Sequence, residues 1–116
     1  MNQLSLNFNG HDTPNQHGVY VDCERLAMPR GQSRAAAEIR IAFVPEGFIF
    51  GVSVEMETEG MGGLPSDSCM KYGYVSPSRT EAIKRACERI ERFCSKTKSK
   101  ASAAILAWLG QIKEAT

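Results

Sequence analysis

Two alternating apolar runs on either side of a proline–glycine turn constrain the fold more than any other feature. In EIRIAFV (38–44) isoleucine or phenylalanine occupies every second position, and in GFIFGVSVEME (47–57) phenylalanines and valines share one side. Because successive side chains of a β-strand point to opposite faces, this period predicts strands with one dry face and one wetter face. Pro45 presets the first turn position, and Gly47 accepts the left-handed conformation that closes a three-residue loop. The two runs therefore predict an antiparallel β-hairpin.

The C-terminal part of the chain carries a helical pattern. Ser78 and Glu81 have the S-x-x-E spacing of a capping box, which marks a helix start. Apolar residues then recur every three or four positions, and a second amphipathic helix follows KTKSK. Cys87 and Cys94 lie about 10 Å apart along the first helix and are interpreted as core residues, not as a bonded pair. The first stripe contains Ile83, Cys87, Ile90 and Cys94, widened by Ala86 and Phe93, and the second contains Ala101, Ala104, Ile105, Trp108, Leu109 and Ile112.

Weaker signals surround this frame. GVYVDC (18–23) holds β-branched and aromatic residues and indicates an additional strand, whereas LAMPRGQS (26–33) reads as a loop. The glycine- and serine-rich stretch TEGMGGLPSDSC (58–69) is expected to be a long loop. KYGYV (71–75) is expected to be a third strand. The side chains expected on one face of that strand are Met70, Tyr72 and Tyr74.

A sheet with both helices on one face would bury all of these stripes in a single core. We therefore expect an α+β fold: an antiparallel sheet of three strands, or four with a strand near Val19, and two C-terminal helices packed on one face. The expected order is β-β-β-α-α. A chain of 116 residues has the size of one domain. Residues 1–18, which are polar and turn-rich, are expected to form a flexible N-terminal segment, and residues 19–116 a single domain.

Composition and charge exclude several broad classes. The formal net charge is +1, so no global field commits the chain to nucleic acid or to an anionic membrane. The sequence shows no apolar run of membrane-spanning length and no secretory leader, which predicts a cytoplasmic protein. Thiols stay reduced in that compartment. The four cysteines are Cys23, Cys69, Cys87 and Cys94.

No residue pattern identifies an enzyme. CxxC, HxxxH and HExxH motifs are absent from the sequence, and His11 and His17 fall in a turn-rich stretch, so no metal site is expected. The run SDSC (66–69) offers nucleophiles, but these two histidines are the only imidazole bases, and nothing in the sequence brings them together. We expect a non-enzymatic protein without a cofactor.

The local charge is more informative than the net charge. Arg92 and Lys96 fall at the end of the first helix, where the helix dipole favours cations without any functional reason. Lys98 and Lys100 fall at the start of the second helix, where a bound phosphate or an acidic partner would offset their unfavourable position. These four residues are candidates for binding nucleic acid or an acidic partner; the alternative is a solvated linker. The whole basic cluster is Lys84, Arg85, Arg89, Arg92, Lys96, Lys98 and Lys100.

The N-terminal stretch QLSLNF resembles the Q-x-x-L-x-F peptide by which bacterial replication and repair proteins bind the sliding clamp. Gln3, Leu6 and Phe8 match its defining positions, and Leu4 suits its preferred second position. The resemblance implies that Gln3 makes polar contacts at the rim of the clamp pocket while Leu6 and Phe8 fill it. The alternative is structural, because Leu4, Leu6 and Phe8 also alternate as on a strand with one buried face.

Residues 38–95 look like small uncharacterised proteins encoded by phages and plasmids, a resemblance that brings no agreed activity with it. We therefore expect a phage or mobile-element binding protein in a bacterial cytoplasm, acting as a replication or repair accessory factor docked on the sliding clamp. One alternative is an anti-defence inhibitor, directed at a CRISPR or restriction complex by stoichiometric binding. A further alternative is a small nucleic-acid-binding module. The expected partner is a host protein or nucleic acid, and not a membrane.

Overall fold

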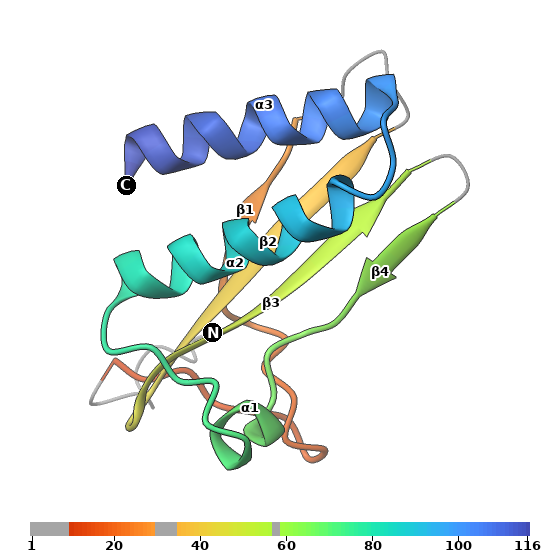
Figure 1. The fold of residues 1–116 in the computed structure, drawn as a ribbon. Coiled ribbons are helices and arrows are strands. Elements are labelled where there is room, and N and C mark those ends of the chain that lie inside the picture. Colours follow the sequence, from red (N-terminus) through yellow and green to blue (C-terminus); the bar gives the residue numbers. More distant parts are fainter. Residues whose placement is uncertain (1–9, 30–34, 57–58) are drawn as a thin grey trace.

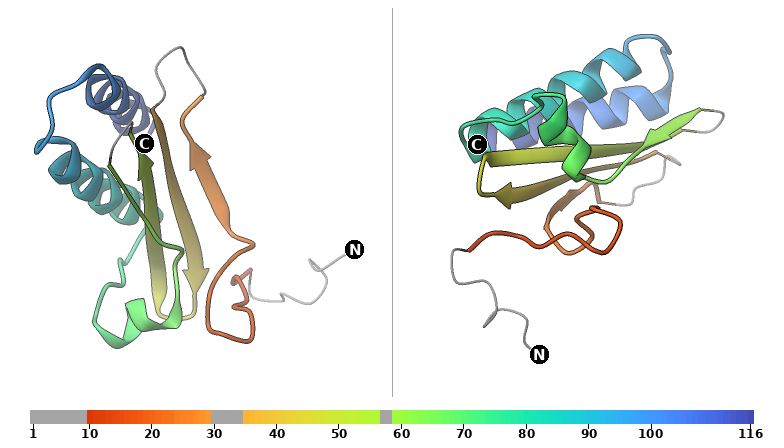
Figure 2. Two further views of the ribbon diagram at one scale, coloured as in Figure 1. Left: turned by 90° about the vertical axis from the view of Figure 1, so that its right-hand side faces the viewer. Right: turned by 90° about the horizontal axis from the view of Figure 1, so that it is seen from below.

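The computed structural model describes residues 10–29, 35–56 and 59–116. Four strands form one antiparallel sheet in the order β1-β2-β3-β4, and the two long helices lie on the same face of it (Figure 1, Figure 2). The expected α+β class with two C-terminal helices is confirmed. The elements are β1 (Glu24–Ala27), β2 (Ala36–Val44), β3 (Gly47–Glu55), β4 (Gly60–Gly62), α1 (Asp67–Lys71), α2 (Arg79–Cys94) and α3 (Lys100–Ala115).

The predicted hairpin is formed by β2 and β3, but its turn is shorter than expected. The pairing continues to Val44 and Gly47, so only Pro45 and Glu46 connect the strands, not a three-residue loop. Gly47 has a φ of +143°, and a Cβ atom there would lie 2.5 Å from the Ser76 carbonyl oxygen. The glycine is therefore needed because the chain entering α2 passes close to the hairpin end.

The main core lies between the sheet and the two long helices. Both predicted helical stripes are confirmed, because their central residues are buried in one core cluster with residues of β2 and β3. Ser78 accepts a hydrogen bond from the Glu81 backbone N–H at 3.1 Å, as its predicted capping role requires. Burial raises the pKa of the Cys87 and Cys94 thiols, as expected for core residues. The largest fully buried core side chains are Ile39, Ile41, Ile83, Ile90, Ile105 and Leu109.

The opposite face of the sheet is not uniformly solvated. Near the hairpin turn it carries a second apolar cluster of Ala42, Val44, Ile49 and Tyr20, all buried. Tyr20 donates a backbone hydrogen bond to the Pro65 carbonyl, so the chain covers this part of the sheet with its own N-terminal segment (Figure 2). The expected division into a dry and a wetter face therefore holds only away from the turn.

The prediction of a third strand at KYGYV (71–75) is wrong. Its start belongs to α1, and Gly73, with a φ of +77°, turns the chain so that the Tyr74 N–H bonds to the Cys69 carbonyl at 2.7 Å. Tyr72 and Tyr74 are 68% and 61% exposed, not aligned on a sheet face with Met70. The alternating tyrosines resembled a strand, but the turn formed by Gly73 is incompatible with extended backbone.

The two edge strands lie where the sequence predicted loops. β4 falls inside the glycine-rich stretch 58–69, and β1 falls where the expected strand near Val19 gives way to the expected loop 26–33. Val19 itself makes only an isolated bridge to Ser66. Both edge strands are short and have weak β propensity. Their extended backbone is therefore stabilised by pairing with the neighbouring long strands.

The described part of the predicted flexible segment 1–18 packs on the domain. The Asp12 N–H donates to the Phe43 carbonyl at 2.7 Å, and the Asp12 carboxylate accepts the Phe43 N–H at 2.8 Å. The His11 ring packs edge-on against Phe43 at a centroid distance of 4.6 Å. Within the segment predicted to be flexible, residues 1–18, these contacts are made at His11 and Asp12, and residues 1–9 of that segment lie outside the described residues.

Substitution of Gly51 tests how closely the chain after β4 passes over β3. A Cβ atom at Gly51 would lie 2.4 Å from the Gly63 carbonyl oxygen, whereas a Cβ atom at Gly63 would meet nothing within 4 Å. We predict that Gly51→Ala lowers the free energy of unfolding by about 1–3 kcal/mol, because the backbone must shift to accept the methyl group. Gly63→Ala is the matched control and should change it by less than about 0.5 kcal/mol. Urea denaturation measures both, and equal effects would contradict the crossing.

Candidate functional site

The described cations differ in whether a carboxylate pairs with them. Arg25, Arg40, Arg79 and Lys113 each form an ion pair with a glutamate. Across residues 10–29, 35–56 and 59–116, no member of the predicted basic cluster between Lys84 and Lys100 forms one. The positive charge that carboxylates do not compensate is therefore concentrated on α2 and on the chain just after it.

A groove of about 780 Å³ runs along this charged side of α2. α2 packs on β3 and β2, and β4 lies beyond its edge (Figure 1). Residues of α2, β3 and β4 line the groove. Arg85, Arg89 and Arg92 are spaced by four and three residues, which places them on one helical face. Lys96 extends the charged wall past the end of the helix.

Apolar side chains complete the groove. Phe50 from β3, Met61 from β4 and Phe93 from α2 are half-buried, pack against the main core and also line the groove. Tyr74 lines it as well, from the turn after α1. One carboxylate, Glu88, lies among the cations. The groove thus combines a strongly basic wall with an apolar floor.

The structure separates the four predicted binding residues into two pairs. Arg92 and Lys96 line the groove, whereas Lys98 and Lys100 are exposed outside it. At the start of α3 the Ser102 N–H donates to Ser99 Oγ at 3.1 Å, and the Ser99 N–H donates to Ser102 Oγ at 3.0 Å. This capping box satisfies two of the free donors, so no bound anion is needed to explain this helix terminus.

Several groove residues were not predicted as site residues. Arg85 and Arg89 belonged to the basic cluster, and their spacing relative to Arg92 already placed them on one helical face. Tyr74 was assigned to a strand, and Met61 to a loop. Neither carried a signal in the sequence, because their position in the groove depends on how the turn after α1 and the edge strand β4 pack beside α2.

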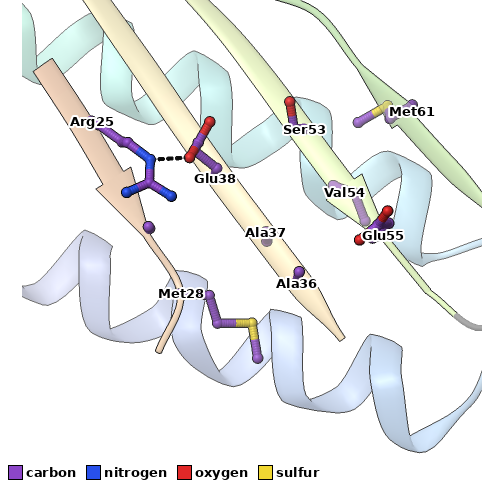
Figure 3. A pocket seen from close by; sticks show the side chains of 10 residues that line it. Arg25, Met28, Ala36, Ala37, Glu38, Ser53, Val54, Glu55 and Met61 are labelled. Carbon is purple, nitrogen blue, oxygen red and sulfur yellow. Dashed lines mark hydrogen bonds and ion pairs between the residues drawn. The ribbon is translucent and has the colours of Figure 1, made fainter. Parts of the chain in front are cut away.

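A second, shallower hollow of about 350 Å³ lies on the face of the sheet away from the helices (Figure 3). Glu38 is one of its lining residues and is paired with Arg25 and with Arg40, the latter at 2.8 Å. Burial alone would raise the pKa of Glu38, but hydrogen bonds from Arg40 and Arg25 outweigh it and lower that pKa. Arg40 also donates to the Val21 carbonyl at 2.9 Å. Both arginines are engaged by the one carboxylate, and the Arg25–Glu38 pair braces β1 against β2, so these groups offer less to a ligand than the groove cations do, which are unpaired within the described part of the chain.

The nucleophile-rich run 66–69 lies beside the N-terminal segment, where the Asp67 N–H donates to the Gly18 carbonyl at 2.8 Å. The Tyr20 hydroxyl donates to Asp67 at 3.0 Å, and burial together with this carboxylate raises the pKa of Tyr20 to about 12. His17 is exposed, and its ring nitrogen lies 3.3 Å from the Gln16 amide. In the part of the chain that the structure describes, no three His, Cys, Asp or Glu side chains cluster as a metal site would require.

Comparison with known proteins assigns no family. No protein-family model, no curated protein and no solved structure matches this chain. Among the described helices, none is both long and apolar enough to cross a membrane. The groove and the N-terminal motif are therefore the features of the chain that bear on its function.

The ion pairs of Glu38 should make the free energy of unfolding depend on pH. Because its pKa is lowered in the folded state, its charge stabilises the fold above the ordinary value near 4.5, and this contribution is lost as the pH falls through the folded-state pKa. We predict that Glu38→Gln costs about 1 kcal/mol at pH 7 and less as the pH approaches 3. Urea unfolding across this range measures the difference. Glu55→Gln, at an exposed position on the same face, is the control; a cost for Glu38→Gln that is independent of pH would contradict the prediction.

Proposed function

We propose that the protein is a non-catalytic nucleic-acid-binding module that holds a sugar–phosphate backbone in the groove beside α2. The observation that carries this proposal is the set of four groove cations, none of which is paired with a carboxylate in the described part of the chain. Of the functions predicted from the sequence, this one has the most direct support from the geometry.

The charge of the groove exceeds that of the whole chain. Four cations and the single carboxylate of Glu88 give the groove lining a formal charge of +3, whereas the chain carries +1. A concave surface with an apolar floor focuses such a charge and raises the local concentration of anions. A low net charge is therefore compatible with binding a polyanion at this one place.

The spacing of the cations favours a repeating anion over an isolated one. Residues three or four apart on a helix lie about 5–6 Å apart, so Arg85, Arg89 and Arg92 form an evenly spaced row. Arginine binds phosphate oxygens through two parallel N–H groups, and most contacts that position a nucleic acid are made to its phosphates. A backbone with a phosphate at every nucleotide matches this row.

Charge reversal at the centre of the row tests the proposal. We predict that Arg89→Glu weakens binding of a fluorescent oligonucleotide by about tenfold or more and reduces the slope of log K against log[salt] by about one. Lys98→Glu makes the same change of charge outside the groove and should reduce affinity by less than about threefold. Circular dichroism checks that both variants fold. Equal losses in the two variants, or no binding by the wild type at low salt, would contradict the proposal.

Docking on a bacterial sliding clamp is a second candidate function, and it is supported by the sequence of QLSLNF alone. Gln3, Leu4, Leu6 and Phe8 lie outside the described residues. Asp12, four positions after Phe8, is bonded to the hairpin, so a clamp bound to QLSLNF would lie close to the domain. Clamp docking and groove binding are compatible, because they use different residues. The anti-defence alternative stays a prediction.

The clamp proposal predicts that Leu6→Ala/Phe8→Ala abolishes binding to the purified clamp in a titration, because both pocket-filling side chains are removed. The same variant should keep its circular dichroism spectrum, its unfolding midpoint and its affinity for oligonucleotides. Unfolding of the variant would instead assign QLSLNF to the structural alternative. Absence of clamp binding by the wild type at high micromolar concentration would eliminate the proposal.

A further inference from the structure

Tyr74 is a large aromatic side chain that stays mostly exposed although its backbone is firmly placed. Its ring is 61% exposed and lines the groove. On one side its N–H bonds to the Cys69 carbonyl at 2.7 Å, and two residues later Ser76 and Phe48 exchange backbone hydrogen bonds of 2.8 and 2.9 Å. Bonds on both sides therefore hold the tyrosine in place without burying it.

The groove floor presents further apolar surface beside the cations. The half-buried side chains of Phe50, Met61 and Phe93 pack inward on the main core and line the groove on their outer side. Phosphates alone would not use this surface. The floor and Tyr74 instead suit a ligand that carries flat apolar groups along an anionic backbone.

Resting on the proposed function, we infer that the occupant of the groove is a single strand of DNA or RNA, with at least one unpaired base stacked on Tyr74. In a duplex the base faces are covered by their neighbours, so only phosphates and groove edges are offered to a protein. A single strand offers phosphates to an arginine row and base faces to aromatic rings at the same time. The arginine row would then contact the phosphates, and Tyr74 and the apolar floor would contact the bases.

The dimensions limit the site to a few nucleotides. The cations from Arg85 to Lys96 extend over about 16 Å at the rise of an α-helix. This length corresponds to a site of roughly four nucleotides, at the lower end of known single-strand sites. The base faces against the floor contact carbon surfaces and not a fixed set of donors and acceptors, so tolerance of base sequence is expected.

Tyr72 provides a matched control for Tyr74. It is 68% exposed and only two positions away, but it does not line the groove, and its ring lies 5.8 Å from the Lys71 ammonium group. Replacing either tyrosine with alanine removes the same exposed ring from the same turn. Of these two tyrosines, Tyr74 is the one that lines the groove and is placed to meet a base.

The test compares an oligothymidine, an oligouridine and a duplex of the same length by fluorescence anisotropy. We expect the wild type to prefer single strands and Tyr74→Ala to weaken their binding by about tenfold, with duplex binding changed by less than about twofold. Tyr74→Phe, which keeps the ring, and Tyr72→Ala should both bind as the wild type does. A preference for oligothymidine or for oligouridine identifies the strand as DNA or RNA, and either supports the inference.

Two results would overturn the inference. Equal affinity of the wild type for duplex and single strands would show that the bases are not used, as would the same loss for Tyr74→Ala on both ligands. If Arg89→Glu still abolished binding in that case, the proposed function would stand while the single-strand inference failed. If no ligand bound the wild type at low salt, both would fail together.

Discussion

The antiparallel pairing of β2 with β3 is the interaction on which the rest of the structure depends. Each strand is nine residues long, and the pairing extends along both without interruption. It aligns Ile39 and Ile41 with Val52 and Phe50 on the face that receives the helices, and it sets Ala42 and Ile49 on the opposite face beneath Tyr20. The short strands β1 and β4 extend this pair at its two edges.

The same packing orients the charges of α2. Burial of Ile83, Cys87 and Ile90 fixes the rotation of the helix about its axis, because apolar burial at these positions outweighs any preference of exposed side chains. With that face against the sheet, Arg85 and Arg89 remain exposed on the side that borders the groove. Core packing of α2 thus determines which of its side chains border the groove. The charge of the groove comes from side chains that are not buried in the core.

Sequence periodicity was sufficient for the elements whose signals are local. The β2–β3 hairpin and both long helices follow from residue spacing and from the cap at Ser78, because burial of one face rewards each pattern directly. The prediction of a strand at KYGYV was wrong because two alternating tyrosines are too short a pattern to outweigh a turn at Gly73. β1 and β4 were missed because their extended backbone is supported by hydrogen bonds to a neighbouring strand and not by their own residues.

By itself the sequence determined the α+β class, the two stripes of the core and the presence of a basic cluster between Lys84 and Lys100. Residue spacing already placed Arg85, Arg89 and Arg92 on one helical face, but which cations lie beside an apolar floor was decided by tertiary structure. Arg92 and Lys96 join Arg85 and Arg89 beside an apolar floor, whereas Lys98 and Lys100 do not, because the floor comes from β3 and β4. Residues distant in sequence meet there only after the sheet has formed, and no local pattern along the chain encodes that meeting.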